Sequence, residues 1–478
     1  MAQYVADSQL PIDDGAGSEV ITDEADFYMS NATEISTTGV DTATIPPVQS
    51  IEGNNVYMFR YKSALRQVID VKKTKLRLTM KITYADGTNI PAQIGNPAAD
   101  NPALKVLPVN NIGSALFNSC EVSINDQIIE GGDTMYAYKA DIQTRLKNSK
   151  DVKDNQLKLQ NFTNEYCKWD DLTNAEKDAI FAATGPDYNN RRKNPFIERY
   201  LRSKKSKVFQ VESDIYADFF REHKFLPPNT SLQIALTKQK DPEKFCLLTE
   251  EDTEYKIVVI KAELILKLKQ LDQDFVDTSI TNFRNGAPYR TEYTSVEIIR
   301  FATNTGYTDL GETDIFKLNS YSPERFVMVL VDQDAFNGIK NKDPFAYKRH
   351  GVKYFKLKRS DNLTRHEPVF MDRWGNDTKD ILEGVSNLYL ALDLYSNPEE
   401  SIGIDMGNFD LGNFFMAFNL KKTEGQGVYS LPDKAVNSLE ITCAALTCPI
   451  AKIVYAEFNT ELLIDAFGTV TVRKNALA

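Results

Sequence analysis

Residues 74–83 read TKLRLTMKIT, and apolar side chains alternate with polar ones throughout this stretch. One side of the extended chain carries apolar residues and the other carries polar residues, namely Leu76, Leu78, Met80 and Ile82 against Lys75, Arg77, Thr79 and Lys81. A period of two residues is that of a β-strand, and a charged face means that only the opposite face packs against a core. The stretch therefore predicts one strand of a half-buried antiparallel sheet.

The same alternation recurs in both halves of the chain. In the first half it covers residues 122–124 and 232–236, and a longer run in which Val258, Ile260, Ala262, Leu264, Leu266 and Leu268 would share one face. In the second half, apolar runs predict strands at residues 326–331, 352–357, 388–394, 439–441, 450–458, 462–464 and 470–472. A polar, acidic junction near residues 270–277 separates the halves, and the long connections are rich in Asn, Asp, Gly and Pro. The pattern predicts two β-sandwich domains of similar size.

Helical patterns are few. Residues 136–146 predict an amphipathic helix that is capped near Asp133 or Thr134. Residues 172–181 predict a second helix, because Thr173 precedes Glu176 by three positions, the spacing of a capping box. Residues 377–385 form a weaker helical stretch.

Composition sets the class of protein. The 478 residues are 42% hydrophobic and 26% charged, which is ordinary for a globular chain and long enough for two or three domains. No apolar run approaches the roughly 18 residues of a membrane span. The N-terminal residues lack the pattern of a signal peptide, and the five cysteines form no CxxC pair, so we expect free thiols in a reducing compartment. The net charge of −11 disfavours a protein whose main task is to coat nucleic acid.

The first 45 residues contain nine acidic side chains and no Lys or Arg, and Pro46 and Pro47 follow them. Such a segment cannot bury a core of its own. We expect residues 1–50 to be a flexible acidic arm. Either the arm becomes ordered against a partner or it is a plain mobile tail, and the sequence leaves both readings open.

Catalytic patterns are missing from the sequence. The histidines, His223, His350 and His366, lie far apart, and no phosphate-binding loop motif occurs. Cys443 and Cys448 lack a second pair that would complete a zinc site, so we expect them to pack inside. Asp332 and Asp334 could divide acid and base roles on a sugar bond, but they follow a strand and fit a turn better. We therefore predict no enzyme, no catalytic residue, no cofactor and no metal.

One segment is strongly basic, and Phe196 and Tyr200 lie within it. Its cations are Arg191, Arg192, Lys193, Arg199, Arg202, Lys204, Lys205 and Lys207, against the single acid Glu198. Basic residues interleaved with aromatic ones favour a local contact with nucleic acid, or with the acidic arm of a neighbouring subunit. A solvated loop surface is the alternative.

Several segments resemble, in their order along the chain, the double jelly-roll major capsid proteins of the Polinton (Maverick) and adintovirus kind, in the lineage of large DNA virus capsids. In the first half they are ALFNSCEVSINDQII (115–129), YAYKADIQTRLKNS (136–149), FLPPNTSLQIALTK (225–238) and YKIVVIKAELILKLKQL (255–271). In the second half they are GAPYRTEYTSVEI (286–298), FVMVLVDQDAFNGIKNKDPFAYKRHGVKYFKL (326–357), GNFDLGNFFMAFNL (407–420) and VYAEFNTELLID (454–465). The chain departs from the family in lacking a proline at the tyrosine-rich helix start and in residues 161–207, which match nothing in the family.

The resemblance implies an all-β protein of two tandem eight-stranded antiparallel jelly rolls with long loops and a few short helices. The first would span residues 51–271, with an insert near 161–207, and the second residues 272–478. It further implies a structural capsid protein that forms pseudo-hexagonal homotrimers, which tile an icosahedral shell and are assembled inside the host cell. The implied partners are neighbouring trimers, vertex (penton) and minor capsid proteins, and locally the packaged genome.

Two alternatives stay open at the sequence level. The first is another virion component, such as a spike or vertex protein. The second is a β-sandwich protein that binds or hydrolyses carbohydrate, which would need paired carboxylates and exposed aromatic platforms. The chain has only two tryptophans, Trp169 and Trp374, which disfavours this alternative.

Overall fold

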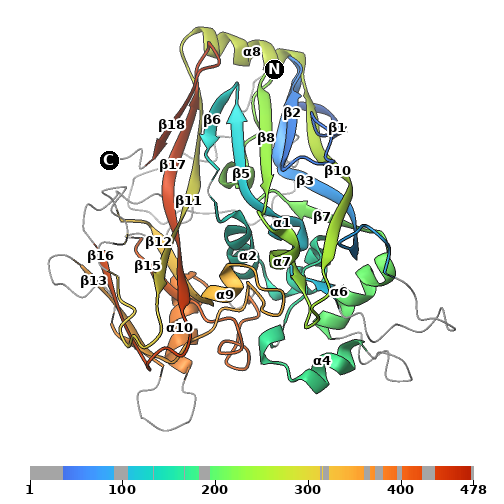
Figure 1. Ribbon diagram of the computed structural model, residues 1–478. Coiled ribbons are helices and arrows are strands. Elements are labelled where there is room, and N and C mark those ends of the chain that lie inside the picture. The colour runs from blue at the N-terminus through green and yellow to red at the C-terminus, as the bar shows by residue number, and fades with distance from the viewer. Residues whose placement is uncertain are drawn as a thin grey trace, which may run out of the picture.

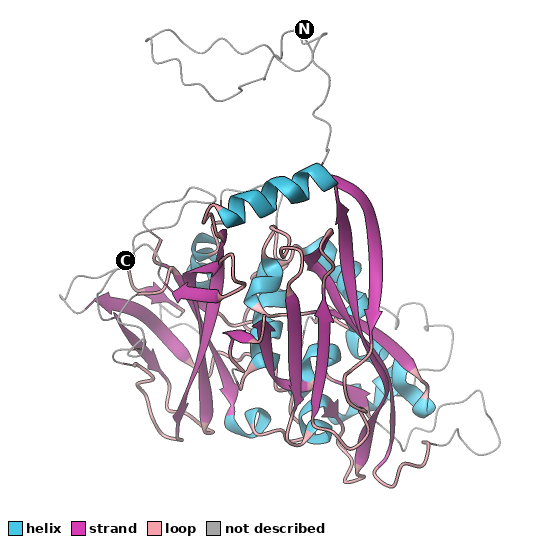
Figure 2. Ribbon diagram, turned by 90° about the horizontal axis from the view of Figure 1, so that it is seen from above, coloured by secondary structure: helices cyan, strands magenta, loops and turns pink. Residues whose placement is uncertain are grey.

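The computed structural model describes residues 36–90, 106–132, 134–165, 167–181, 194–312, 315, 322–359, 367–371, 381–395, 401–421 and 437–474. Two groups of sheets lie side by side, one from each half of the chain, and helices lie between them (Figures 1 and 2). All strand pairs within these sheets are antiparallel.

The first half forms two four-stranded sheets. One contains, in spatial order, β1 (Thr37–Ile45), β10 (Tyr255–Leu271), β3 (Gln67–Tyr84) and β7 (Phe209–Asp214). The other contains β2 (Val56–Lys62), β8 (Ser231–Lys238), β5 (Phe117–Ile124) and β6 (Gln127–Glu130). A short pair joins β4 (Leu107–Pro108) to β9 (Leu247–Leu248). Buried residues of both large sheets, such as Leu78 and Ile234, belong to one core.

The second half forms a five-stranded and a three-stranded sheet. The larger contains β11 (Tyr289–Thr303), β17 (Ile450–Ile464), β12 (Arg325–Asp332) and β15 (Met416–Asn419), and β18 (Val470–Lys474) also pairs with β17. The smaller contains β14 (Val369–Phe370), β13 (Val352–Arg359) and β16 (Asn437–Cys443). Strand β17 is buried at nearly every position, because it lies inside the sheet and both of its faces are covered. The sequence predicted two separate strands here.

The helices are short. They are α1 (Ile112–Ala115), α2 (Tyr136–Lys147), α3 (Lys150–Asp154), α4 (Asn174–Phe181), α6 (Pro195–Ser203), α7 (Pro242–Cys246), α8 (Gln273–Arg284), α9 (Gln333–Phe336) and α10 (Leu382–Ala391). The 3-10 turns are η2 (Gln156–Gln160), η3 (Trp169–Asp171), η4 (Lys204–Ser206) and η5 (Asp218–Arg221). Within the described part of the chain, no helix has the length and apolar character that crossing a membrane requires.

The capping box predicted at the start of α4 is confirmed. The Thr173 backbone N–H donates to the Glu176 carboxylate at 2.8 Å, and the Glu176 N–H donates to the Thr173 hydroxyl at 3.3 Å. The two side chains thus satisfy the free N–H groups of the first turn reciprocally.

The alternation in β3 is confirmed, since Leu76, Leu78 and Met80 are buried. In β10 the predicted single face is wrong at Ile260, which is 48% exposed. The pairing with β3 shifts register between Val259 and Lys261, so an extra residue bulges out of the strand. Because side chains alternate with period two, one extra residue moves the positions before it to the opposite face.

The strand predicted at residues 388–394 is a helix in the structure. Leucines at every second position suggested a half-buried strand, but α10 covers Leu382–Ala391. No β-branched residue occurs between Ser386 and Tyr395, whereas Leu and Ala favour helices. The helix buries Leu388 and leaves Leu390 55% exposed. The weaker helix predicted at residues 377–385 begins only at Leu382, and residues 372–380 lie outside the described residues.

The prediction of a flexible arm over residues 1–50 is wrong for part of this range. Residues 37–45 form β1, whose backbone pairs with β10 from Thr37 to Ile45 and extends the sheet. A polar segment can add an edge strand because backbone hydrogen bonds, not a core, hold it. Residues 1–35 lie outside the described residues. All five cysteines are free, as predicted.

Candidate functional site

Helix α2 lies between the two groups of sheets, at the centre of the molecule (Figure 1). Every residue from Tyr136 to Leu146 is buried. The sequence predicted an amphipathic helix, but its polar positions are buried as well as its apolar ones. The helix starts after Met135 and has no side-chain cap, so the cap predicted at Thr134 is wrong; Asp133 lies outside the described residues.

Near the start of α2, the Lys139 amine lies between two carboxylates. It is 2.5 Å from Glu130 on β6 and 2.9 Å from Asp218 on η5, and the Lys139 and Asp218 side chains are both 3% exposed. Burial, with help from Asp218, raises the pKa of Glu130 to about 7. Burial alone would lower the pKa of Lys139, but the attraction of the two carboxylates outweighs it and raises that pKa. Asp218 also accepts the backbone N–H of Val296 on β11 at 2.7 Å. The cluster therefore joins β6, α2 and the second half.

Six residues further along α2, Arg145 reaches the loops of the second half. Its guanidinium pairs with Asp141 at 2.8 Å and donates to the side-chain oxygen of Asn413 at 2.7 Å and to the carbonyl of Phe345 at 3.2 Å. The Tyr347 hydroxyl donates to the same Asp141 carboxylate at 2.7 Å. A charge in such a dry place is tolerated only when it is paired and its hydrogen bonds are made. We call the contacts of Lys139, Asp141 and Arg145 the α2 network.

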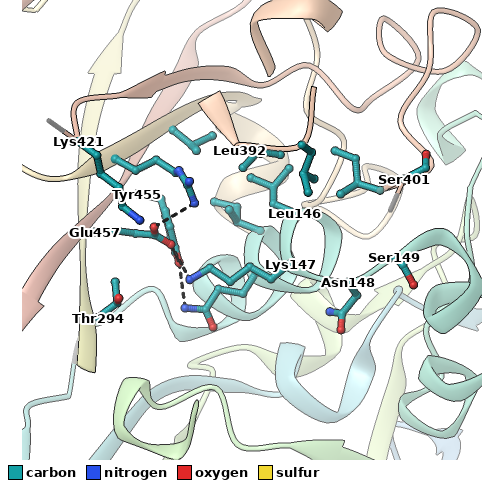
Figure 3. A pocket seen from close by; sticks show the side chains of 16 residues that line it. Leu146, Lys147, Asn148, Ser149, Thr294, Leu392, Ser401, Lys421, Tyr455 and Glu457 are labelled. Atoms are coloured by element: carbon teal, nitrogen blue, oxygen red, sulfur yellow. Dashed lines mark hydrogen bonds and ion pairs between the residues drawn. The ribbon is translucent and has the colours of Figure 1, made fainter. Parts of the chain in front are cut away.

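A pocket of about 350 Å³ opens beside the last turn of α2 (Figure 3). Its walls come from both halves of the chain, and its charged side chains are Lys147, Arg325, Lys421 and Glu457. Glu457 is the sole carboxylate among the described residues that line the pocket. The pocket is therefore basic, and it lacks the pair of carboxylates that sugar hydrolysis requires.

Glu457 itself is fully occupied by its neighbours. Its carboxylate lies 2.5 Å from the Lys147 amine and 3.5 Å from Arg325, and it accepts the Tyr455 hydroxyl at 3.0 Å. Burial would raise its pKa, but Lys147 and Arg325 lower it to about 2. A carboxylate that stays ionised and paired at neutral pH serves structure and cannot act as a general acid.

The structure describes five of the eight cations in the predicted basic segment. Arg199 on α6 is completely buried, and its charge is compensated there because its guanidinium pairs with Glu165 at 2.5 Å. Arg202 is partly buried and donates to the carbonyl of Lys158 at 2.7 Å. Lys204 and Lys205 are partly exposed, and Lys207 is exposed. Arg191, Arg192 and Lys193 lie outside the described residues. Arg199 is therefore removed from the predicted contact set, since the helix turns it toward the interior.

Other candidates for chemistry also have structural explanations. Trp169 is buried and donates to Glu250 at 3.0 Å, so it is no platform for a sugar; Trp374 lies outside the described residues. Asp332 is the last residue of β12 and Asp334 lies in the first turn of α9, as a strand-end turn requires. The Lys342 amine lies 3.6 Å and 3.2 Å from these two carboxylates.

The sequence held an unused signal for the α2 network. Lys139 and Gln143 are four residues apart on one side of the helix, and Asp141 and Arg145 are four apart on the opposite side. Because polar pairs lie on two opposite sides, the helix has no single polar face that could point to solvent. Its polar side chains therefore need protein partners on every side. What the sequence does not reveal is which residues of the second half provide those partners.

Comparisons with known proteins identify chains and structures that this protein resembles. No family model matches the chain. An uncharacterized protein of Caenorhabditis elegans is 22% identical over 407 residues, which cover 84% of this chain and 89% of the relative.

Solved structures match nearly the whole chain. A chain in the cryo-electron microscopy structure of the Sputnik virophage matches with a TM-score of 0.62 at 12% identity, over 96% of this chain and 94% of that one. The mavirus major capsid protein matches with a TM-score of 0.51 at 11% identity, over 96% of both chains. A chain of the PBCV-1 virus capsid matches with a TM-score of 0.52 at 10% identity, over 93% of this chain and 99% of that one. The chain therefore has the double jelly-roll fold of these structures, and the predicted fold class is confirmed.

Proposed function

We propose that this protein is a major capsid protein whose homotrimers tile an icosahedral virus shell. The observation that carries the proposal is the match of two complete jelly rolls, over 96% of the chain, to the Sputnik virophage structure and to the mavirus major capsid protein. A structural match at such low sequence identity shows only the fold, so the function is argued from the shape of the whole chain. A chain with two sandwiches side by side gives, in a threefold trimer, six sandwiches and a nearly hexagonal outline that can tile a surface.

The α2 network supports this role. A capsid building block has to transmit force between neighbours without a hinge between its two sandwiches. Here Arg145 and Asp218 bridge the halves through short hydrogen bonds in the dry interior, so the halves form one rigid unit. The same features do not support a carbohydrate enzyme. Among the described residues, the pocket at the junction offers one carboxylate, Glu457, which stays ionised and is paired with cations.

The acidic arm fits a role between subunits. Residues 1–35 contain eight acidic side chains and no Lys or Arg. Asp272, which precedes α8, donates its backbone N–H to the Ser36 carbonyl at 2.9 Å, so the arm leaves the block at that end. A second groove, which shares Lys147 and Asn148 with the first pocket, is lined by residues of the first half. Its cations are Lys72, Lys75, Lys147 and Arg221, and Asp214 is the single acid among its described lining residues. We assign this groove as the place where the arm of a neighbouring subunit binds, since the opposite charges attract.

Two further kinds of partner follow from the shell itself. A closed icosahedral shell has fivefold corners that a hexagonal trimer cannot fill, so we infer a vertex (penton) protein at these corners, and we propose minor capsid proteins as further partners of the trimers. The net charge of −11 limits any contact with the packaged genome to local patches such as Lys204, Lys205 and Lys207.

Sedimentation of the purified full-length chain tests the trimer, and deletion of residues 1–35 tests the arm. We expect both proteins to sediment as trimers, with a chain mass of 54.0 kDa for the full-length protein and a smaller one for the truncated protein, whereas only the full-length protein forms shells. The deletion stops before β1, so the sheet stays complete. A full-length chain that stays monomeric at every concentration would contradict the capsid proposal. Shells of normal yield from the truncated chain would contradict the arm proposal alone.

A further inference from the structure

A cluster of three potential metal ligands lies at one end of the second jelly roll, away from the α2 network. Asp332 is the last residue of β12, His350 lies in the turn before β13, and Cys448 lies two residues before β17. The pairing of β12 with β17 places Asp332 opposite Ile450 and so brings Cys448 close. The sequence predicted no metal site, because these three residues come from separate segments with no spacing motif.

The donor atoms of the cluster point toward one another. The Cys448 thiol donates to Asp332 Oδ1 at 3.1 Å, and His350 Nε2 lies 3.5 Å from the same oxygen. All three donor atoms lie within 4.8 Å of one another. Zinc bonds of about 2.0–2.3 Å in a tetrahedron place neighbouring donor atoms about 3.3–3.6 Å apart. Small side-chain rotations therefore bring the three atoms to ligand distance of one ion.

His350 gives the second, independent indication. Its side chain is only 8% exposed, and its Nε2 atom is buried, has no hydrogen-bond partner and faces the carboxylate and the thiol. A buried polar nitrogen without a hydrogen bond costs stability, and a bound ion would use its lone pair.

The second carboxylate oxygen of Asp332 is already held from the other side. The Lys342 amine lies 3.6 Å from Asp332 Oδ2 and 3.2 Å from Asp334 Oδ2. Asp332 Oδ1 is thereby oriented toward His350 and Cys448, as outer partners orient the carboxylates that bind metals. One thiolate and one carboxylate would neutralise a divalent ion, so the two nearby lysines, Lys342 and Lys348, do not repel the complete site.

We propose that Asp332, His350 and Cys448 bind one Zn²⁺ ion per chain, with water as the fourth ligand. Sulfur, imidazole nitrogen and carboxylate oxygen form a mixed donor set that suits zinc better than calcium or magnesium. The ion would tie together the end of β12 and the starts of β13 and β17, and so stabilise the loops at this end of the second jelly roll.

Cobalt(II) is the probe of choice, because its spectrum reports both features of the site. A thiolate ligand gives a near-ultraviolet band, and tetrahedral geometry gives absorption in the visible range. We expect the chelator-treated full-length protein to bind one Co²⁺ with these bands, and Zn²⁺ to remove them by displacement. Cys448→Ser should abolish the sulfur band, and His350→Ala should weaken binding by more than about 100-fold, since even outer-shell changes cost about 10- to 100-fold.

Cys443→Ala is the matched control, because Cys443 lies on neighbouring β16 and contacts the Tyr307 carbonyl rather than the cluster. This variant should keep the cobalt spectrum. Thermal melts in chelator establish that each variant is folded, and saturating Zn²⁺ should raise the melting temperature of the wild type and of Cys443→Ala only. Folded wild-type protein without cobalt bands, or bands that persist in both Cys448→Ser and His350→Ala, would overturn the proposal.

Discussion

Helices α2 and α8 both connect the two jelly rolls, but they do so in opposite ways. Helix α8 is the covalent link between β10 and β11, and among its residues whose burial the structure describes only Val276 is fully buried, whereas most of the polar side chains are exposed. Helix α2 is remote from that link, yet every residue from Tyr136 to Leu146 is buried, its charges are paired within the first half, and Arg145 donates hydrogen bonds to the second half. The comparison teaches that packing around α2, rather than the connecting chain, holds the two sandwiches in one orientation.

The largest effect is expected at Arg145. Arg145→Ala leaves Asp141 buried without its ion partner and should lower the free energy of unfolding by about 3–5 kcal/mol in denaturant titrations. Arg60→Ala is the matched control, because Arg60 and Asp126 form an exposed pair at 2.9 Å and its loss should cost less than about 1 kcal/mol. Equal effects of the two substitutions would refute the importance of the α2 network.

A slightly smaller effect, which depends on pH, is expected at Glu457. Its pKa is lowered from 4.5 to about 2, which corresponds to about 3 kcal/mol of stability at neutral pH. Because the folded pKa is the lower one, this contribution is present above pH 4.5 and is lost as the pH falls toward 2.

Glu457→Gln should therefore be less stable than the wild type at neutral pH, and the difference should shrink as the solution is acidified. Denaturant titrations over a series of pH values measure both. Glu52→Gln, at an exposed position, should leave the profile unchanged. A constant difference between Glu457→Gln and the wild type down to acidic pH would contradict the assigned pKa.

On α8, the effect of substitution should be confined to Val276. This residue packs with Val68 and Leu271 in a small apolar cluster, separate from the main core. Val276→Ala removes two buried methyl groups and should cost about 2 kcal/mol or less by denaturant titration. A loss as large as that of Arg145→Ala would show that α8 holds the jelly rolls together as firmly as α2.

The smallest effect is expected on the exposed side of α8. Asn282→Ala replaces an exposed residue by a better helix former and should change the free energy of unfolding by less than about 0.5 kcal/mol. Thermal melting is sensitive enough to compare it with Val276→Ala. A marked destabilisation would mean that this side of α8 contacts another subunit or another part of the chain.

Alternation of side chains predicted β3, β5, β8 and β10, whereas β1, β2 and β7 were not predicted. It reports a strand with one wet and one dry face, which is the situation of Leu76, Leu78 and Met80. It failed where burial is two-sided, as in β17, where a bulge changes the phase, as at Ile260, and where good helix formers happen to alternate, as in α10. The helix α8 was missed, although Asp272 caps it and Val276 and Ile280 have helical spacing.

The candidate sites were harder to predict than the fold. Two hydrogen-bond partners of Arg145, Phe345 and Asn413, lie 200 and 268 residues away along the chain. Only the tertiary structure brings them together. Arg199 shows the converse error, since a basic run in the sequence does not reveal which cation turns inward to Glu165. The ligands of the proposed zinc site come from three separate segments that no local spacing connects.

The capsid proposal is tested most directly by negative-stain electron microscopy of the purified full-length chain. We predict six-sided plates with threefold symmetry, and sheets or closed shells of such plates at higher concentration. Isolated particles of a single 54.0 kDa chain, with no plates at any concentration, would contradict the account.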